Sequence, residues 1–131
     1  VRTAQADVNG DGILDLIVAS GPGGGRVIVY SLRDGSTLAD FTPFGGIAGG
    51  LFVAAGDFNR DGKAEVVVTP DSGNGLGAKV LVFDGASIVG ATSTPTKIAD
   101  FFGLADTSGA PETATVVGGR VAVGDVNGDG V

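Results

Sequence analysis

The sequence predicts an all-β protein made of four-stranded antiparallel propeller blades, and three observations support this fold class. Short runs rich in Val and Ile alternate with turn residues, and none of them shows a sustained helical period. Glycine is very frequent, with 25 residues among 131 and no collagen-like period, which indicates many tight turns. The order of runs and turns then repeats along the chain, and repeated four-strand units are typical of propeller blades.

The first repeat unit begins at an acidic loop and continues through three β-like runs. The loop is Asp7-Val8-Asn9-Gly10-Asp11-Gly12, and the runs cover residues 13–20, 26–30 and 38–41. The run at residues 27–30 is apolar at both odd and even positions. We therefore expect both faces of this strand to be buried between neighbouring sheets.

The second repeat unit follows the same order. A run at residues 51–56 leads into the diverged loop Asp57-Phe58-Asn59-Arg60-Asp61-Gly62, and the next runs cover residues 63–70, 79–83 and 98–101. Its additional length, at residues 86–96 and 107–118, is rich in Ser, Thr, Gly and Pro and is expected to form loop insertions. A two-sheet sandwich is the rival architecture, but it predicts cleaner alternation and no such repeat.

A third unit begins near the end of the sequence. The run at residues 120–124 leads into Asp125-Val126-Asn127-Gly128-Asp129-Gly130, which is identical to the first loop. The sequence ends one residue later and contains no Met, so we interpret the chain as a fragment or processed portion of a longer protein. The outer blades are then expected to expose apolar faces, and such faces drive association with further blades or further copies of the chain. The expected faces are Val27 with Val29 or Val80 with Val82.

The acidic loops offer the ligands that calcium prefers. Calcium takes about six to eight oxygen ligands, and carboxylates and an Asn at every second residue supply them where a Gly permits the bend. A first calcium site is predicted at Asp7, Asn9, Asp11, the Ile13 carbonyl and Asp15, and a second at Asp57, Asn59, Asp61, the Lys63 carbonyl and Glu65. The third loop offers Asp125, Asn127 and Asp129. It lacks the closing acid and is expected to bind weakly or not at all.

Other loops with the same opening fit less well. An EF-hand needs a Glu at its twelfth position and flanking helices, and a dockerin-type loop also needs an acid or amide there. The twelfth residues here are Val18 and Val68. A metal-free turn is the remaining alternative, because Asp, Asn and Gly favour turns on their own. Three copies in register weigh against it, since uncompensated carboxylates so close together would repel one another.

Composition and charge exclude several function classes. The formal net charge is −7, but eight of the 15 acids lie in the three loops, and without them the charge would be +1. The acidity therefore belongs to the loops, and the basic surface of a nucleic-acid-binding protein is missing. The sequence has neither Cys nor His, which removes disulfides, thiolate or imidazole metal sites and the Ser-His-Asp triad. No apolar run is long enough to be a membrane span.

The sequence resembles the FG-GAP repeats of integrin α-subunit propellers and their bacterial relatives. The resemblance is carried by residues 53–62, by residues 121–130, and by the Phe-Gly pairs that begin at Phe44 and Phe102. It implies a calcium-binding propeller in which residues 1–6 are a first strand, and in which Glu65 replaces the family's usual Asp. It also implies three segments. These are a first blade at residues 1–44, a second at 45–103, and an insertion loop with the truncated start of a third blade at 104–131.

Two function classes remain open from the sequence. The first is a non-catalytic calcium-binding module of a secreted or surface protein, which serves adhesion, scaffolding or filament assembly and binds a protein or glycan ligand. A passive spacer in a tandem array is not separable from it by sequence. The second is an enzyme, because related propellers occur in polysaccharide lyases and Tyr30, Lys79 or Lys97 is available as a base. Each of these side chains also has an ordinary role at a strand edge, so no catalysis is expected.

Overall fold

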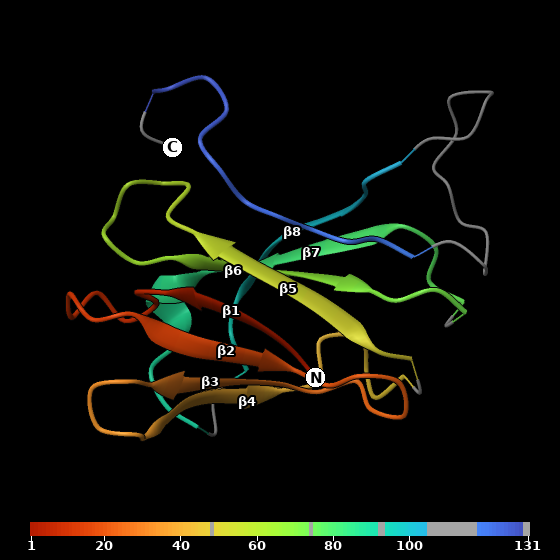
Figure 1. Ribbon diagram of the computed structural model, residues 1–131, viewed down its shortest axis with the longest axis horizontal. Coiled ribbons are helices and arrows are strands. Elements are labelled where there is room, and N and C mark those ends of the chain that lie inside the picture. The colour runs from red at the N-terminus through yellow and green to blue at the C-terminus, as the bar shows by residue number, and fades with distance from the viewer. Residues whose placement is uncertain (48, 74, 92–93, 105–117, 130–131) are drawn as a thin grey trace.

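The computed structural model describes residues 1–47, 49–73, 75–91, 94–104 and 118–129. Within these ranges the chain forms two four-stranded antiparallel sheets and one short 3-10 helix (Figure 1), so the predicted all-β fold class is confirmed. In each sheet, strands that follow one another in the chain are also neighbours in space. Such up-and-down order is expected of propeller blades, whereas the strands of a sandwich cross from one sheet to the other.

The first sheet contains β1 (Arg2–Ala6), β2 (Asp15–Ala19), β3 (Val27–Ser31) and β4 (Thr37–Phe41). Alternate residues of β2 and β3 are buried, as expected for strands with one face against a core. The prediction that β3 is buried on both faces is therefore wrong. Its other face is partly exposed, because it lies on the side of the sheet that carries no second layer among the described residues.

The second sheet contains β5 (Leu51–Gly56), β6 (Glu65–Pro70), β7 (Lys79–Phe83) and β8 (Lys97–Phe102), with the 3-10 helix η1 (Gly85–Ser87) after β7. All six residues of β6 are buried. Its Val-rich run is apolar on both faces, and here both faces are covered. The two-sided burial expected from sequence is thus found in the second sheet, where β6 lies between two layers.

One hydrophobic core joins the two sheets. Strand β1 packs against β5, and the buried side chains of both sheets form a single cluster. Phe41 and Phe83 meet in it edge to face, with ring centroids 4.9 Å apart. Val27 and Val29 are fully buried in the same cluster, so the expectation that they form an exposed face is wrong. The second sheet covers them.

Several strand limits differ from the sequence prediction. Residues 13–14 and 63–64 belong to the acidic loops, and the strands begin only at the closing acids Asp15 and Glu65. Residues 120–124 form no strand. The first strand of a blade forms its backbone hydrogen bonds with the strand that follows its loop. No such strand follows the third loop within these 131 residues. The insertion expected at residues 107–118 lies, except for Gly118, outside the described residues.

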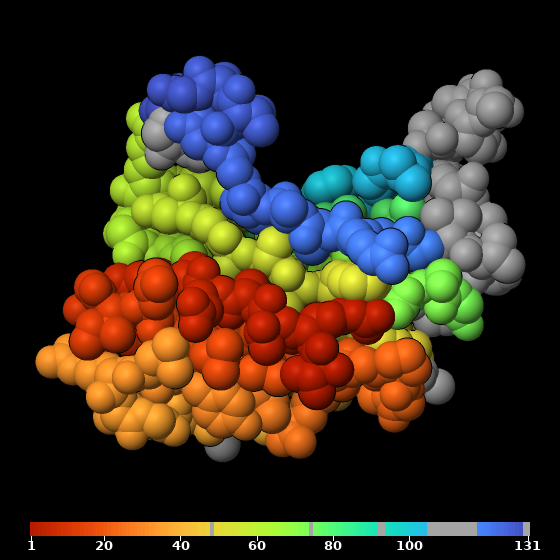
Figure 2. Space-filling view, viewed as in Figure 1, coloured from red at the N-terminus to blue at the C-terminus, as the bar shows by residue number. Residues whose placement is uncertain are grey.

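The third unit nevertheless docks on the second as the second docks on the first. Leu51 lies six residues before the first Asp of its loop, and its N–H donates to the Ser20 carbonyl at 3.0 Å. Gly119 holds the same position in the third unit, and its N–H donates to the Pro70 carbonyl at 3.0 Å. Residues 118–129 consequently lie on the surface of the second sheet, as Figure 2 shows in blue. The repeat therefore extends to the way in which successive units join.

Three equivalent side chains connect the units at the end of the sheets away from the acidic loops. Arg2, Phe52 and Arg120 each lie five residues before the first Asp of their loop. The guanidinium carbon of Arg2 is 3.9 Å from the centroid of the Phe52 ring, and that of Arg120 is 5.2 Å away. Arg2 also pairs with Asp71 and donates to the Leu51 carbonyl at 3.3 Å. These contacts join blade to blade through one aromatic ring.

Replacing this ring by an aliphatic side chain should weaken the junction. We expect Phe52→Leu to lower the free energy of unfolding by about 1 kcal/mol, because Leu retains most of the apolar area but not the attraction of the ring for two cations. Denaturant unfolding measures the change. The matched control is Phe101→Leu, since Phe101 is about half exposed on β8, and this variant should change stability less. Equal losses in both variants would contradict the proposed role of the ring.

No helix among the described residues is long and apolar enough to cross a membrane.

Candidate metal centre

The two acidic loops join the first and second strands of their sheets and lie at the same end of the molecule (left in Figure 1). Register fixes both ends of each loop. Ala6 pairs with Asp15 across β1 and β2, and Gly56 pairs with Glu65 across β5 and β6. The acid at the first position follows one strand directly and the acid at the ninth position begins the next. Antiparallel pairing therefore brings first and ninth positions of the motif together.

Side-chain oxygens organise the backbone of the first loop. Asp7 Oδ1 accepts the N–H groups of Gly10 and Asp11, and Asp7 Oδ2 accepts that of Gly12 at 2.8 Å. Asn9 Oδ1 accepts the Asp11 N–H at 2.9 Å, and Asp11 Oδ1 accepts the Ile13 N–H at 2.9 Å. Gly12 has a φ of 82°, which confirms the left-handed bend expected there. The loop is thus closed around its own acids.

The second loop repeats this pattern. Asp57 accepts the N–H groups of Asp61 and Gly62, Asn59 Oδ1 accepts that of Asp61, and Asp61 Oδ1 accepts that of Lys63. Gly62 has a φ of 85°. The two loops therefore share one conformation despite the substitutions between them. The N–H groups of Ile13 and Lys63 hold both residues at the seventh position, where a backbone carbonyl was predicted as a ligand.

The acid that closes the first loop is buried, and only one of its two carboxylate oxygens accepts a hydrogen bond. Asp15 is fully buried, and its Oδ2 accepts the Val8 N–H at 2.9 Å. Its Oδ1 is also buried and has no hydrogen-bond partner. Burial raises the pKa of the Asp15 carboxyl, and the charges of Asp11 and Asp7 raise this pKa further. An unpaired buried carboxylate oxygen beside two more acids fits a bound cation, which would compensate all three.

The closing acid of the second loop is equally buried. Glu65 Oε2 accepts the Phe58 N–H at 2.7 Å, and Oε1 accepts an Asn59 amide N–H at 3.2 Å. Burial raises the pKa of the Glu65 carboxyl, and Asp61 and Asp57 raise it further. The longer Glu side chain thus reaches the same backbone position as Asp15 does in the first loop. The replacement of Asp by Glu is accommodated without a change in the loop.

One acidic residue near the second loop was missed from the sequence. Carboxylate oxygens of Asp61, Glu65 and Asp84 all lie within 4.8 Å of one another. Asp84 follows β7 and comes from outside the loop motif. The repeat alignment places it opposite Ser31, which is not a charged ligand, so comparison of the two units gave no signal. The register of β6 with β7 is what brings Asp84 to the loop.

The third loop repeats the opening of the other two. Asp125 Oδ1 accepts the Gly128 N–H at 2.6 Å, and Asn127 Oδ1 accepts the Asp129 N–H at 3.2 Å. Arg60 of the second loop donates to the Asp129 carbonyl and lies 3.6 Å from its carboxylate. The three loops therefore form a row. The first and second loops also touch, since the Ala64 N–H donates to the Asp7 carbonyl at 2.7 Å.

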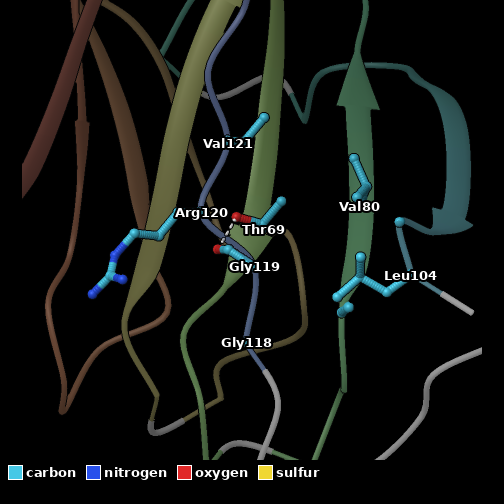
Figure 3. Close-up of a pocket in the computed structure, with 9 residues that line it drawn as sticks. Thr69, Val80, Leu104, Gly118, Gly119, Arg120 and Val121 are labelled. Atoms are coloured by element: carbon cyan, nitrogen blue, oxygen red, sulfur yellow. Dashed lines mark hydrogen bonds between the residues drawn. The ribbon is translucent and has the colours of Figure 1, made fainter. Parts of the chain in front are cut away.

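The residues considered as a catalytic base belong to strands β3, β7 and β8 and not to the loops themselves. Lys79 and Lys97 both pair with Asp100, and Tyr30 lies on β3 opposite Leu16. A cavity of about 220 Å³ opens between residues 118–121 and the second sheet (Figure 3). Thr69, Val80 and Leu104 line it, and Thr69 Oγ1 donates to the Gly119 carbonyl at 2.6 Å. Arg120 is the one charged residue among those that line it.

The comparisons with known proteins agree with the repeat seen in the sequence. Residues 7–68 match the family model described as the FG-GAP-like repeat. The match begins at the first Asp of the first loop and ends within β6, so it includes both complete acidic loops. Neither a curated protein nor a solved structure matches the chain.

Proposed function

We propose that the chain is a calcium-binding, non-catalytic propeller module of a secreted or surface protein, because its residues 7–68 match the FG-GAP-like repeat. Such repeats are typical of extracellular and surface proteins, and adhesion or scaffolding is the role that we propose for this one. The observation that carries the calcium proposal is the buried Asp15 Oδ1, which has no hydrogen-bond partner and lies in a loop with two further acids. A cation at this oxygen would remove the cost of burying the charge.

The donor set supports calcium over other cations. The loops supply carboxylates, an amide and backbone carbonyls, which are the hard oxygen ligands that calcium prefers. Magnesium takes fewer protein ligands and keeps several waters, so it needs no closed loop with ligands at every second residue. Zinc and copper prefer imidazole or thiolate ligands. Asp7, Asn9, Asp11 and Asp15 would hold the first ion, and Asp57, Asn59, Asp61 and Glu65 the second.

Substitution of one loop at a time tests this proposal. We expect Asp11→Ala to abolish binding at the first loop and Asp61→Ala to abolish binding at the second, with each variant largely sparing the other loop. Titration calorimetry would then give one bound calcium in each variant. The loops meet through Ala64 and Asp7. The change in calcium affinity at the remaining loop therefore measures how strongly this contact couples the two sites.

The control is Asp34→Ala. Asp34 lies in the turn between β3 and β4, where its Oδ1 accepts the Ser36 N–H at 2.9 Å. Its removal deletes an acid of the same type without touching a loop, so calcium stoichiometry should not change. Full stoichiometry in Asp11→Ala or Asp61→Ala would show that these acids are not ligands.

The same proposal places the chain within a closed propeller or a multi-copy assembly. Ile98 and Phe101 of β8 and Leu104 after it are each about half exposed, and Leu104 also lines the cavity under residues 118–121. Exposed apolar groups of this kind are covered by a neighbouring blade in a propeller. We expect light scattering in millimolar calcium to detect particles larger than 12.8 kDa. A cooperative monomer at all concentrations would contradict this expectation.

The contacts of the candidate bases support the non-catalytic part of the proposal. Lys79 and Lys97 share Asp100 as an ion-pair partner, and Lys79 also lies 5.6 Å from the centroid of the Phe102 ring. Each lysine therefore stabilises the edge of the second sheet. A base that removes a proton from a sugar would instead face a cleft.

A further inference from the structure

The two loops have different surroundings although their conformation is the same. In the second sheet Val66 pairs with Phe83, so Glu65 and Asp84 are the next residues along the two strands. This register explains why an Asp84 oxygen lies within 4.8 Å of oxygens of both Asp61 and Glu65. The second loop therefore has four carboxylates at hand, namely Asp57, Asp61, Glu65 and Asp84.

The backbone and one oxygen of Asp84 are fixed by neighbouring residues. The Asp84 N–H donates to the Thr96 carbonyl at 2.9 Å, and Oδ1 accepts the Ala86 N–H at 2.9 Å as the cap of η1. No described residue donates a hydrogen bond to Oδ2. The side chain is thus held beside Glu65 and retains one oxygen for a ligand.

The first loop has no fourth acid at this place. Asp15 pairs with Ser31, which is buried and whose hydroxyl accepts the Arg33 N–H at 3.2 Å. Ser31 therefore holds the position that Asp84 holds in the second sheet. The first loop has three carboxylates, Asp7, Asp11 and Asp15, and one of its carboxylate oxygens already lacks a partner.

A cation of the protein lies beside an acid of the first loop. The Arg33 guanidinium is 3.6 Å from Asp11 Oδ2. This positive charge reduces the attraction of the first loop for a divalent cation.

We propose that Asp84 is an additional calcium ligand of the second loop, and that this loop therefore binds calcium more tightly than the first. The inference rests on the proposed calcium function. The affinity of such loops rises with the number of charged ligands, and the second loop has one more carboxylate. At intermediate calcium concentrations the second loop fills while the first is still empty.

The test measures each loop alone by titration calorimetry. Asp11→Ala leaves the second loop, Asp61→Ala leaves the first, and the double variant defines binding outside both loops. Asp84→Ser is then added to each parent, because it copies Ser31 and keeps an oxygen that caps η1. We expect Asp84→Ser to weaken binding about tenfold in the Asp11→Ala parent and to leave the Asp61→Ala parent unchanged.

The reciprocal substitution extends the test. Ser31→Asp in the Asp61→Ala parent should strengthen the first loop, provided that circular dichroism shows native structure in calcium. If Ser31→Asp or Asp84→Ser unfolds, Asp84→Asn keeps the shape of the side chain and must show the same weakening. Equal affinity of the two single-loop parents, or no effect of Asp84→Ser and Asp84→Asn on the second loop, overturns the inference. Absence of calcium binding in both parents would instead refute the proposed function.

Discussion

Chelation of calcium is expected to lower the melting temperature of this chain by on the order of 10–20 °C. A bound ion stabilises the folded state by RT ln(1 + [Ca]/Kd), which is about 2.7 kcal/mol for each site at a hundredfold excess over Kd. Extracellular modules of this chemistry have Kd values of roughly 10⁻⁴–10⁻³ M, so tens of millimolar calcium approaches this excess. The effect is large because the same carboxylates repel one another when the ion is removed.

Differential scanning calorimetry in calcium and in excess chelator measures the shift. The double variant Asp11→Ala/Asp61→Ala serves as the control, since it should melt at the same temperature in both conditions. Magnesium in place of calcium should restore only a small part of the stability, because the loops supply more protein ligands than magnesium uses. A wild-type melting curve that is unchanged by chelator would rule out calcium-linked folding.

The strands were predictable because their signal is local. Runs of Val, Ile and Leu between Gly-rich turns gave β2, β3, β5, β6 and β7 to within a few residues. Strand β1 was expected only from the family resemblance, since Arg-Thr-Ala-Gln-Ala has little β character of its own. It becomes a strand through pairing with β2 and packing against β5. Tertiary contacts here override weak local preference.

The errors in the fold concern which faces are covered. Sequence predicted exposure of Val27 and Val29, because nothing in a run of apolar residues identifies the sheet that will cover it. Both side chains are fully buried against the second sheet, Val80 and Val82 are partly buried, and Ile98 and Phe101 of β8 are about half exposed instead. Coverage of a strand depends on the order in which the sheets stack, and the periodicity of one strand contains no such information.

The same distinction between local and distant signals applies to the candidate site. The loop positions could be predicted because nine consecutive residues specify them, and Gly12 and Gly62 take the expected bend. Asp84 lies 19 residues after Glu65 and reaches the loop only through the register of β6 with β7. A register of this kind pairs residues that are far apart in the chain, and no local motif marks it. Sequence alone does not specify it.

Neutralising the buried closing acid should have opposite effects with and without calcium. In chelator at neutral pH, we expect Asp15→Asn to raise the free energy of unfolding by on the order of 1 kcal/mol, because it removes a buried charge with an unpaired oxygen. Oδ1 of the new Asn can still accept the Val8 N–H, and its NH₂ group can donate to the neighbouring acids. In saturating calcium the same variant should be less stable than the wild type, because the first site loses a charged ligand.

The pH dependence separates this explanation from a simple packing effect. The folded-state pKa of Asp15 is raised above its ordinary value of 3.8, chiefly by burial, so its ionisation destabilises the metal-free fold. The penalty is complete above the folded pKa, falls as the pH is lowered through that value, and is absent below the ordinary pKa. The advantage of Asp15→Asn in chelator should therefore disappear on acidification. Urea unfolding at neutral and at acidic pH would measure it, with Asp34→Asn as an exposed control. An Asp15→Asn variant that is less stable than the wild type in chelator at neutral pH would show that the ionised carboxylate stabilises the fold without a metal.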